Sequence, residues 1–303
     1  MMKKAFTLLE MIFVIVISGV LSIGSYKAMQ ALFLRSAKAK AVTDMTLRSQ
    51  IVLDQIGVLL YDRVPNSVIG YDKDDTPVCQ PINELTSSKP TLEWLATMND
   101  ELINSRYDGF IDMGQSDRNT QILVTPDINS SINNNDINLI FSGAFDEGTE
   151  SLKACNGAFG WHTNNSNLSF DVTINDNNIS ITDARQPEYI YEKYYLSKTA
   201  YAITRGKDID RTTPSCVDRY SFLSGKDFNN TLFLFYDYQP YRGETFCADA
   251  IGVPDGNVSV LATDVSGFEA VYINDTIRIN LDMNRIIRGS NSSVHITKQK
   301  VIF

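Results

Sequence analysis

The sequence predicts an α+β protein, in which a long N-terminal helix packs against a C-terminal antiparallel β-sheet domain with a second sheet or an inserted subdomain. Two observations lead to this prediction. No proline occurs between residues 6 and 64, and residues 11–26 contain no charged side chain. From residue 121 onward, short segments alternate apolar and polar residues with the period of two that strands require. A long helix followed by many strands is typical of the α+β class.

The first expected element is one continuous helix over residues 6–64. Its first half, residues 6–34, is apolar enough to cross a bilayer, since a spanning helix needs roughly 20 apolar residues. Its second half, residues 35–64, is rich in good helix formers and repeats apolar residues at steps of three and four. That repeat predicts an amphipathic helix with one face packed against a domain. Pro65 marks the expected end.

The first ten residues carry a recognisable pattern. Lys3 and Lys4, then the small residue Ala5, then Phe6-Thr7-Leu8-Leu9-Glu10 and an apolar stretch resemble the prepilin signal of type IV pilins and pseudopilins. In that family a prepilin peptidase cuts after the small residue and N-methylates the new terminus. The resemblance implies a leader peptide of residues 1–5, cleavage between Ala5 and Phe6, and methylation of Phe6. An ordinary signal peptide, the alternative, has a polar cleavage region after its apolar core; here helix-favouring residues follow instead.

Glu10 is the one carboxylate in residues 6–26. In hydrocarbon an unpaired carboxylate costs at least ~2.5 kcal/mol on insertion scales, so such a residue is functional by default. In the family that the signal resembles, this glutamate pairs with the terminal amine of a neighbouring subunit. An ammonium group and a carboxylate relieve each other's desolvation when their geometry is good. We therefore expect Glu10 to act in subunit assembly.

The charged residues indicate how the chain is oriented in a membrane and argue against a nucleic-acid partner. By the positive-inside rule, Lys3 and Lys4 keep the N-terminus cytoplasmic, so a single-pass protein of the bacterial inner membrane is expected, with a periplasmic C-terminal domain. From there it would be assembled into an extracellular or periplasmic filament. The net charge is −9 and the pI is about 4.8. Nucleic-acid-binding domains are usually basic, so no nucleic-acid partner is expected.

Four cysteines, Cys79, Cys155, Cys216 and Cys247, lie beyond the apolar segment, and no two of them form a C-x-x-C pair. An even number outside the cytosol favours disulfides over a metal or redox site. Four cysteines allow three pairings, and the sequence does not choose between them. We favour nearest neighbours, which would pair Cys79 with Cys155 and Cys216 with Cys247.

Residues 65–303 are expected to form the exported β-rich domain. The acidic run Asp72–Asp75 contains the oxygen ligands that calcium prefers, but no EF-hand pattern follows it, and a solvated acidic loop is the simpler interpretation. Residues 91–105 are predicted to form a second, shorter amphipathic helix. Thr91 would cap this helix, and Trp94 would lie in the core.

Ten strands are expected further along, which is more than one pilin sheet holds. Two tight turns, at Asn175–Asn177 and at Asn274–Asp275, join neighbouring strands, because Asn and Asp tolerate the positive φ of such turns. The expected strands are residues 121–124, 137–142, 168–174, 178–182, 189–196, 199–205, 231–238, 268–273, 276–283 and 294–302. The segments at 189–206 and 265–283 also resemble, loosely, minor pseudopilins of type II secretion.

The sequence offers little catalytic chemistry. Its two histidines are His162, in a Gly/Asn-rich loop without a partner at metal spacing, and His295, on the face of an expected strand. No phosphate-binding loop, nucleophile elbow or zinc-protease motif occurs. We therefore expect no enzymatic activity, no cofactor and no metal. Four Asp-x-Asn-x-Ser/Thr sites resemble bacterial N-glycosylation sites, although chance matches are expected in an Asn-rich chain; they begin at Asp127, Asp176, Asp227 and Asp255.

These observations favour a structural role. The chain is interpreted as a minor pilin or minor pseudopilin of a type IV pilus or type II secretion filament. Its expected partners are a prepilin peptidase, other pilin or pseudopilin subunits and the inner membrane. The alternative is an adhesin or uptake-binding module presented on the same anchor. Its binding surface would use exposed aromatic residues of the segments 189–195 and 233–238, which are otherwise expected in the sheet core.

Overall fold

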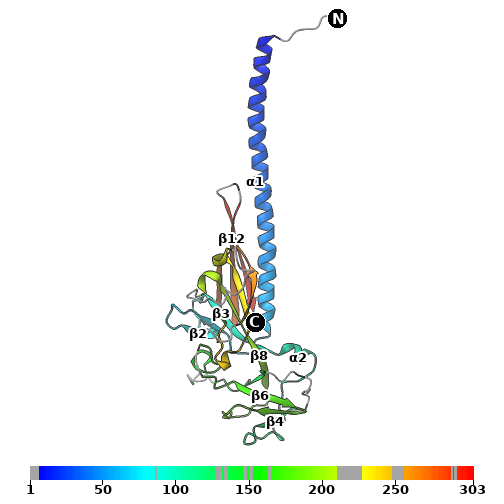
Figure 1. Cartoon of the computed structure of the whole chain (residues 1–303), viewed down its shortest axis with the longest axis vertical. Helices are drawn as coiled ribbons and strands as arrows, with labels where there is room; N and C mark the ends of the chain where they lie inside the picture. The colour runs from blue at the N-terminus through cyan, green and yellow to red at the C-terminus, as the bar shows by residue number, and fades with distance from the viewer. Residues whose placement is uncertain are drawn as a thin grey trace.

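A computed structural model describes residues 7–85, 87–126, 128, 132, 136–145, 149, 153–162, 165–209, 227–247, 256–287, 289 and 292–303. The fold is α+β: one long helix, α1, is followed by antiparallel strands arranged in two sheets. The N-terminal half of α1 projects away from the rest of the chain, whereas its C-terminal half lies beside the strands (Figure 1). The predicted fold class is confirmed, including the second sheet.

Helix α1 runs from Leu8 to Tyr61, with Thr7 as its N-cap and Asp62 as its C-cap. Its 54 residues make it about 81 Å long at 1.5 Å per residue. Every residue from 7 to 62 is described, and within α1 burial begins at Ala41. From there the buried residues recur at steps of one, three and four, which is the pattern of one packed face; they are Ala41, Met45, Ser49, Val52, Leu53, Ile56, Gly57 and Leu60.

The larger sheet has the strand order β2-β1-β3-β8-β5-β6-β7-β4, with β9 paired to both β8 and β10. All its pairings are antiparallel. Its strands are β1 (Ile69–Tyr71), β2 (Cys79–Pro81), β3 (Thr91–Thr97), β4 (Ile122–Val124), β5 (Asn138–Phe141), β6 (Phe170–Asn175), β7 (Asn178–Ile181), β8 (Tyr194–Arg205), β9 (Leu232–Tyr238) and β10 (Asn257–Ala262).

Strand β8 connects the two ends of this sheet. Its first residues, 194–197, pair with β5, and residues 200–205 pair with β9. The sequence predicted two strands here, at 189–196 and 199–205. The predicted break between them was wrong, because β8 is continuous from Tyr194 to Arg205. Ser197 and Lys198 continue the strand, and a register shift opposite Ala96 and Thr97 of β3 absorbs the irregularity.

The smaller sheet consists of β11 (Val265–Ile273), β12 (Thr276–Ile286) and β13 (Ser293–Ile302) in that order. It packs against the C-terminal half of α1, where an apolar cluster includes Met45, Ile56 and Leu281. Gly57 shows how closely the helix approaches β13: a Cβ atom at this position would lie 2.6 Å from Cε of Lys300. A larger residue there would displace the lysine end.

The prediction of a helix over residues 91–105 was wrong. Residues 91–97 form β3, and only Asn99–Ile103 are helical, as the short helix α2. Strand β3 lies between β1 and β8, and its first six residues are all buried. Because both faces are covered, its apolar residues do not alternate and mimic a helical repeat. The Thr91 hydroxyl donates to the Thr204 hydroxyl across the sheet at 3.0 Å instead of capping a helix, while Trp94 is in the core as predicted.

Most other expected strands overlap observed ones, and three short strands were missed. The β6–β7 and β11–β12 hairpins turn at Asp176 and at Asn274–Asp275, all with positive φ, as predicted. The missed strands are β1, β2 and β10. The first two have three residues each, too few for a period of two to emerge, and β10 has four of its six residues at least partly exposed.

Candidate functional site

The start of α1 is held by reciprocal hydrogen bonds between Thr7 and Glu10. The Glu10 backbone N–H donates to the Thr7 hydroxyl at 3.3 Å, and the Thr7 backbone N–H donates to the Glu10 carboxylate at 3.4 Å. This capping box satisfies two backbone donors that a helix start leaves free, and the carboxylate also suits the positive end of the helix dipole. Glu10 is exposed. The predicted cleavage and methylation positions, Ala5 and Phe6, lie outside the described residues.

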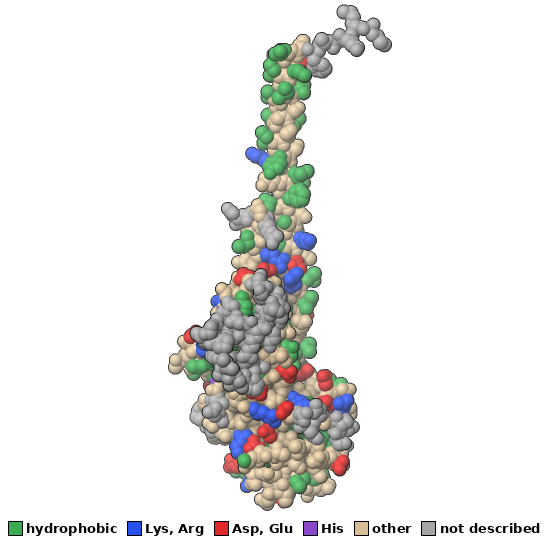
Figure 2. All heavy atoms as spheres, viewed as in Figure 1, with side chains coloured by type: hydrophobic (Ala, Val, Ile, Leu, Met, Phe, Trp, Pro, Cys, Tyr) green, Lys and Arg blue, Asp and Glu red, His purple; other side chains and the backbone are tan. Residues whose placement is uncertain are grey.

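Residues 8–33 of α1 form a rod that is largely apolar, with Glu10 and Lys27 as its charged residues, and no described residue packs against it. Every residue from Leu8 to Phe33 is exposed; Leu8 is 81% accessible, and Phe33 is 70% accessible. Hydrophobic side chains cover this rod in Figure 2. Among the described residues, α1 is the one helix long and apolar enough to cross a membrane. A single N-terminal helix of this kind fits a membrane anchor, because apolar surface of this extent is rarely left in water.

The second half of α1 is fastened to the sheets by polar contacts as well as by the apolar core. The guanidinium of Arg285, on β12, donates to Asp44 of α1 at 2.7 Å and lies 2.6 Å from Asp264. These contacts lower the pKa of Asp44, with the hydrogen bond from Arg285 as the largest cause. One turn before Gly57, Asp54 accepts from Lys300 of β13 at 2.6 Å. Two ion pairs therefore join α1 to the smaller sheet.

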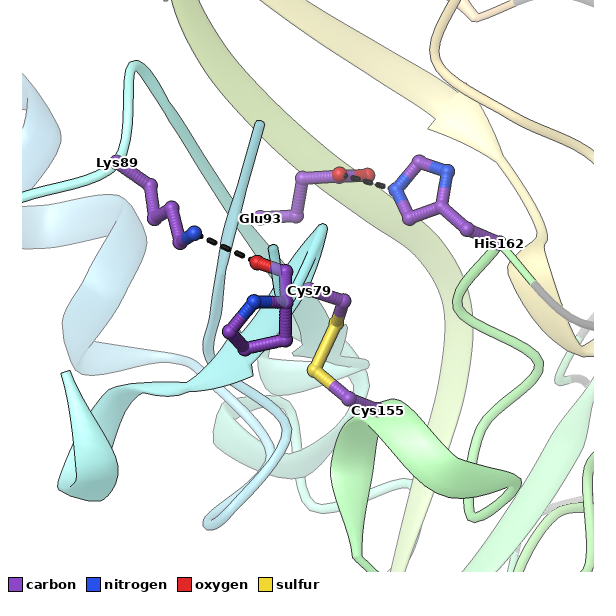
Figure 3. Close-up of a disulfide and its surroundings, with 6 residues drawn as sticks. Cys79, Lys89, Glu93, Cys155 and His162 are labelled. Atoms are coloured by element: carbon purple, nitrogen blue, oxygen red, sulfur yellow. Dashed lines mark hydrogen bonds and ion pairs between the residues drawn. A yellow bond between two sulfur atoms is a disulfide. The ribbon is translucent and has the colours of Figure 1, made fainter. Parts of the chain in front are cut away.

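Two of the four cysteines are joined near the edge of the larger sheet. A disulfide connects Cys79, on β2, with Cys155, in a one-turn 3-10 helix (Figure 3). This is one of the two pairs that the sequence favoured. Cys247 is also disulfide-bonded, and Cys216 lies outside the described residues.

The acidic run beside Cys79 is engaged by a lysine. Lys89 is 4% accessible, and its ammonium group donates to Asp75 and to the Pro77 carbonyl, both at 2.6 Å. The bond from Lys89 is the main cause that lowers the pKa of Asp75. Asp74 is largely exposed. Among the described residues, no group of three or more His, Cys, Asp or Glu side chains is placed to hold a metal ion.

Sequence reasoning missed a buried polar network on β3. The carboxylate of Glu93 is fully buried, accepts from the Tyr238 hydroxyl at 2.8 Å, and lies 2.6 Å from Nε2 of His162. Burial, reinforced by the charge of Glu93, raises the pKa of Tyr238, so its hydroxyl remains a donor. The ring of His162 stacks on Tyr71 with 3.7 Å between centroids. These residues come from four distant segments, so no local motif could have indicated them.

The polar groups of this network are engaged with one another. Its hydroxyl is held protonated, its histidine is sandwiched against an aromatic ring, and its carboxylate has both oxygens engaged. It ties β3, β9, the loop at 162 and β1 together across the larger sheet. We describe it as a structural polar core, in which each buried group has a partner.

The remaining candidate residues are not gathered at one place. His295 lies on β13, is 58% accessible, and approaches Asp282 at 3.8 Å. Of the Asn-containing sites, Asn178 begins β7, Asn229 is in a 3-10 turn, Asn257 begins β10, and Asn129 is outside the described residues. In the aromatic segments, Tyr189 is 61% accessible. Tyr194, Phe233, Phe235 and Tyr238 are buried, as expected of sheet core.

Comparison with known proteins identifies the N-terminal segment. Residues 1–26 match the prokaryotic N-terminal methylation motif. No curated protein and no solved structure matches the chain. The match covers the segment with the prepilin-like pattern and supports a type IV pilin-like subunit that is processed at its N-terminus. Such a motif is typical of structural, non-enzymatic subunits, and it implies processing by a prepilin peptidase and assembly with other pilins.

Proposed function

We propose that the chain is a minor pilin or minor pseudopilin, a structural subunit built into a type IV pilus or a type II secretion filament. A prepilin peptidase cuts between Ala5 and Phe6 and methylates Phe6. The observation that carries the proposal is the pairing of an apolar rod, exposed on all sides from Leu8 to Phe33, with a carboxylate at its head. A rod of this kind has two suitable environments, a bilayer and a bundle of similar helices.

Assembly moves the rod from one environment to the other. Before assembly, residues 6–34 lie in the inner membrane; on assembly they enter a bundle, and Glu10 meets the terminal amine of a neighbouring Phe6. The contacts of Glu10 within its own chain leave it available for this role. Its bond from the Thr7 N–H is 3.4 Å long, whereas a charge-assisted bond from an ammonium is about 2.7–2.9 Å and roughly twice as strong as a neutral one.

The orientation of the subunit follows from the processing signal and not from the flanking charges. Lys3 and Lys4 precede the apolar window, but Lys27, Arg35, Lys38 and Lys40 follow it within one membrane-flanking stretch. The positive-inside count is therefore larger on the side of the globular part. The resemblance to type IV pilins supports the opposite choice, because the subunits of that family are exported. We infer a periplasmic position for residues 65–303 on that ground.

The size of the exported part supports a special position in the filament. Residues 65–303 form two sheets beside and beyond the end of α1, a bulk that neighbouring copies along a repeating shaft would have to accommodate. We therefore place the subunit at the tip or at the initiation point. Counting subunits per filament tests this placement, since a stoichiometry near that of the major subunit would contradict it.

The central experiment replaces Glu10 by alanine. Removing one partner of a buried ion pair costs about 3 kcal/mol or more, so incorporation into filaments should fall about 100-fold. Incorporation is measured by quantifying the subunit in sheared filaments. Thr7→Ala is the matched control, because it removes the cap and keeps the carboxylate; it should incorporate nearly normally.

Two results would contradict the proposal. One is normal incorporation of Glu10→Ala. The other is a mass spectrum of the exported protein in which the chain still begins at Met1 and carries no added methyl group. If filaments formed normally without this subunit while adherence was lost, the adhesin role would be the better description.

A further inference from the structure

Four basic residues follow the apolar window of α1 in an otherwise acidic protein. Between Glu10 and Asp44 the sequence contains Lys27, Arg35, Lys38 and Lys40 and no acidic residue, although the chain as a whole has 36 acidic and 27 basic residues. All four side chains are exposed. Within the described part of the chain, none of them takes part in an ion pair, whereas the next basic residue, Arg48, pairs with Asp44.

Three of the four stand on the face of α1 that is buried further along. Eighteen residues make about five full helical turns, so residues 18 apart share a face. Lys27, Arg35 and Lys38 are 18 residues before Met45, Leu53 and Ile56, which are buried against the sheets. Lys40 is 18 residues before Val58, which is 66% accessible, and lies off this face, where it lines the groove between α1 and β12. The three cations therefore lie on the sheet-facing side of α1, N-terminal to the part of the helix that is buried against the sheets.

The end of the smaller sheet reaches the level of these cations. A groove of 820 Å³ lies between α1 and β12, with Ala37, Lys40 and Ala41 on the helix side and Ile286 on the sheet side. Three aspartates also line it: Asp44, Asp227 and Asp264. In Figure 1 the hairpin rises beside α1 toward the projecting half. Ile286 is 74% accessible. The end of β12 thus presents an exposed apolar side chain across the groove from Lys40.

The spacing along the helix matches a bilayer. Residues 8–26 span about 28 Å, close to the roughly 30 Å of a hydrocarbon core. Lys27 then falls at the boundary, and Arg35 and Lys38 lie about 12 and 16 Å beyond it. Helical side chains tilt toward the helix N-terminus, which is the direction of the membrane, and long basic side chains extend to the headgroups. Their charges lie within about two Debye lengths of the surface.

We propose that Lys27, Arg35 and Lys38 bind anionic phospholipid headgroups of the leaflet that faces the globular part, and that they hold the end of the smaller sheet against the membrane before assembly. The charge of the three residues, their lack of acidic partners and their continuity with the apolar rod favour lipid over a protein partner. The inference rests on the membrane anchorage in the proposed function, but not on filament assembly.

The test uses the full chain in lipid nanodiscs that contain no other subunit. A fluorophore on Ile286→Cys reports proximity to lipids whose headgroups carry a quencher. A basic residue near an anionic surface contributes about fivefold to binding, and this contribution falls off within a Debye length, so Lys27 should contribute most and Lys38 least. We expect strong quenching in discs that contain phosphatidylglycerol, and weak quenching in neutral discs or at high salt.

Two variants make the test specific. Replacing Lys27, Arg35 and Lys38 together by Gln should reduce quenching in anionic discs to the neutral level. A control with the same change in charge, Arg118, Lys193 and Lys73 each replaced by Gln, removes exposed cations of the larger sheet and its turns and should leave quenching unchanged. These substitutions are all on the surface, so folding is retained; a thermal melt of each variant checks this.

Several outcomes would overturn the proposal. Equal quenching in neutral and anionic discs would do so, as would equal loss in both triple variants. If the helix variant kept its quenching but failed to enter filaments, the three cations would serve contacts between subunits instead. Because the discs hold one subunit each, failure here leaves the assembly role of Glu10 standing. Failure of the Glu10 experiment would likewise leave this result intact.

Discussion

The two halves of α1 have the same secondary structure and opposite surroundings. From Leu8 to Phe33 the helix is largely apolar, with Glu10 and Lys27 as its charged residues, and is exposed on every side, whereas from Ala41 to Leu60 one face is buried and the other carries charges. Both halves are continuous α-helix. The difference shows that burial within the chain does not explain the apolar character of the first half. That half is adapted to an environment outside the chain, and the second half is adapted to the fold.

The largest expected effect is on the free energy of unfolding, and it is tested by replacing isoleucine with alanine at three positions on α1. Ile56→Ala removes a fully buried side chain and should lower the free energy of unfolding by about 3–4 kcal/mol. Ile51→Ala, in the same half but 56% accessible, should cost about 0.5 kcal/mol or less. Ile15→Ala, in the exposed half, should change the unfolding of the globular part hardly at all. Denaturant titration in detergent measures all three, and an Ile15 effect as large as that of Ile56 would break the comparison.

An intermediate effect is expected where the sheet supports the last turn of α1. The indole N–H of Trp94 donates to the Leu59 carbonyl at 3.2 Å, which satisfies an acceptor that a helix end leaves free. Trp94→Phe should cost about 2 kcal/mol, because a buried carbonyl loses its partner. Trp161→Phe is the matched control. Its indole N–H is buried without a hydrogen-bond partner in the described structure, so the cost should be clearly smaller. Equal losses would mean that packing and not this hydrogen bond supports the helix end.

The smallest effect concerns the ion pair between Arg285 and Asp44. Both side chains are about a third accessible, so solvent screening limits the contribution to about 1 kcal/mol or less. Arg285→Gln should therefore lower stability slightly at neutral pH. Arg48→Gln also removes a partner of Asp44, but that pair lies within α1 and does not join the helix to the sheet, so it should cost less.

The pH dependence of this pair has a definite sign. The pKa of Asp44 is lowered from 3.8 in the folded state, so its contribution is fully present above that value. It is lost as the pH falls below 3.8 through the lowered pKa, when Asp44 takes up a proton. The difference between the wild type and Arg285→Gln should shrink over that range and be constant above it. A difference that grew on acidification would contradict the assignment.

The same contrast explains what could be predicted from the sequence. The exposed half of α1 was predictable because lipid imposes one local requirement, an uninterrupted apolar helix. Hairpins such as β11–β12 were predictable for a similar reason, since the turn residues Asn274 and Asp275 are themselves local. Strand β3 was not, because its burial on both faces depends on β1 and β8, and a fully apolar strand has no period by which to recognise it.

The polar core around Glu93 shows a second limit. Its carboxylate was one of 36 acidic residues, and nothing near it in the sequence indicates a hydrogen bond to Tyr238 or His162. The partners lie 145 and 69 residues away. A contact of that range is a property of the sheet topology. In that topology β8 runs unbroken past residues 197–198, where the sequence predicted a break between two strands.

The way α1 lies beside β13 has a mechanical consequence. Asp44 meets β12 at Arg285, which pairs with Val294 of β13, and ten residues later Asp54 meets Lys300 of the same strand. Helix and strand thus run side by side in the same direction. A load pulling on the helix along its axis would slide the two past each other, so that both ion pairs and the apolar contacts between them resist together. A sideways load would open the same contacts one after another and meet far less resistance.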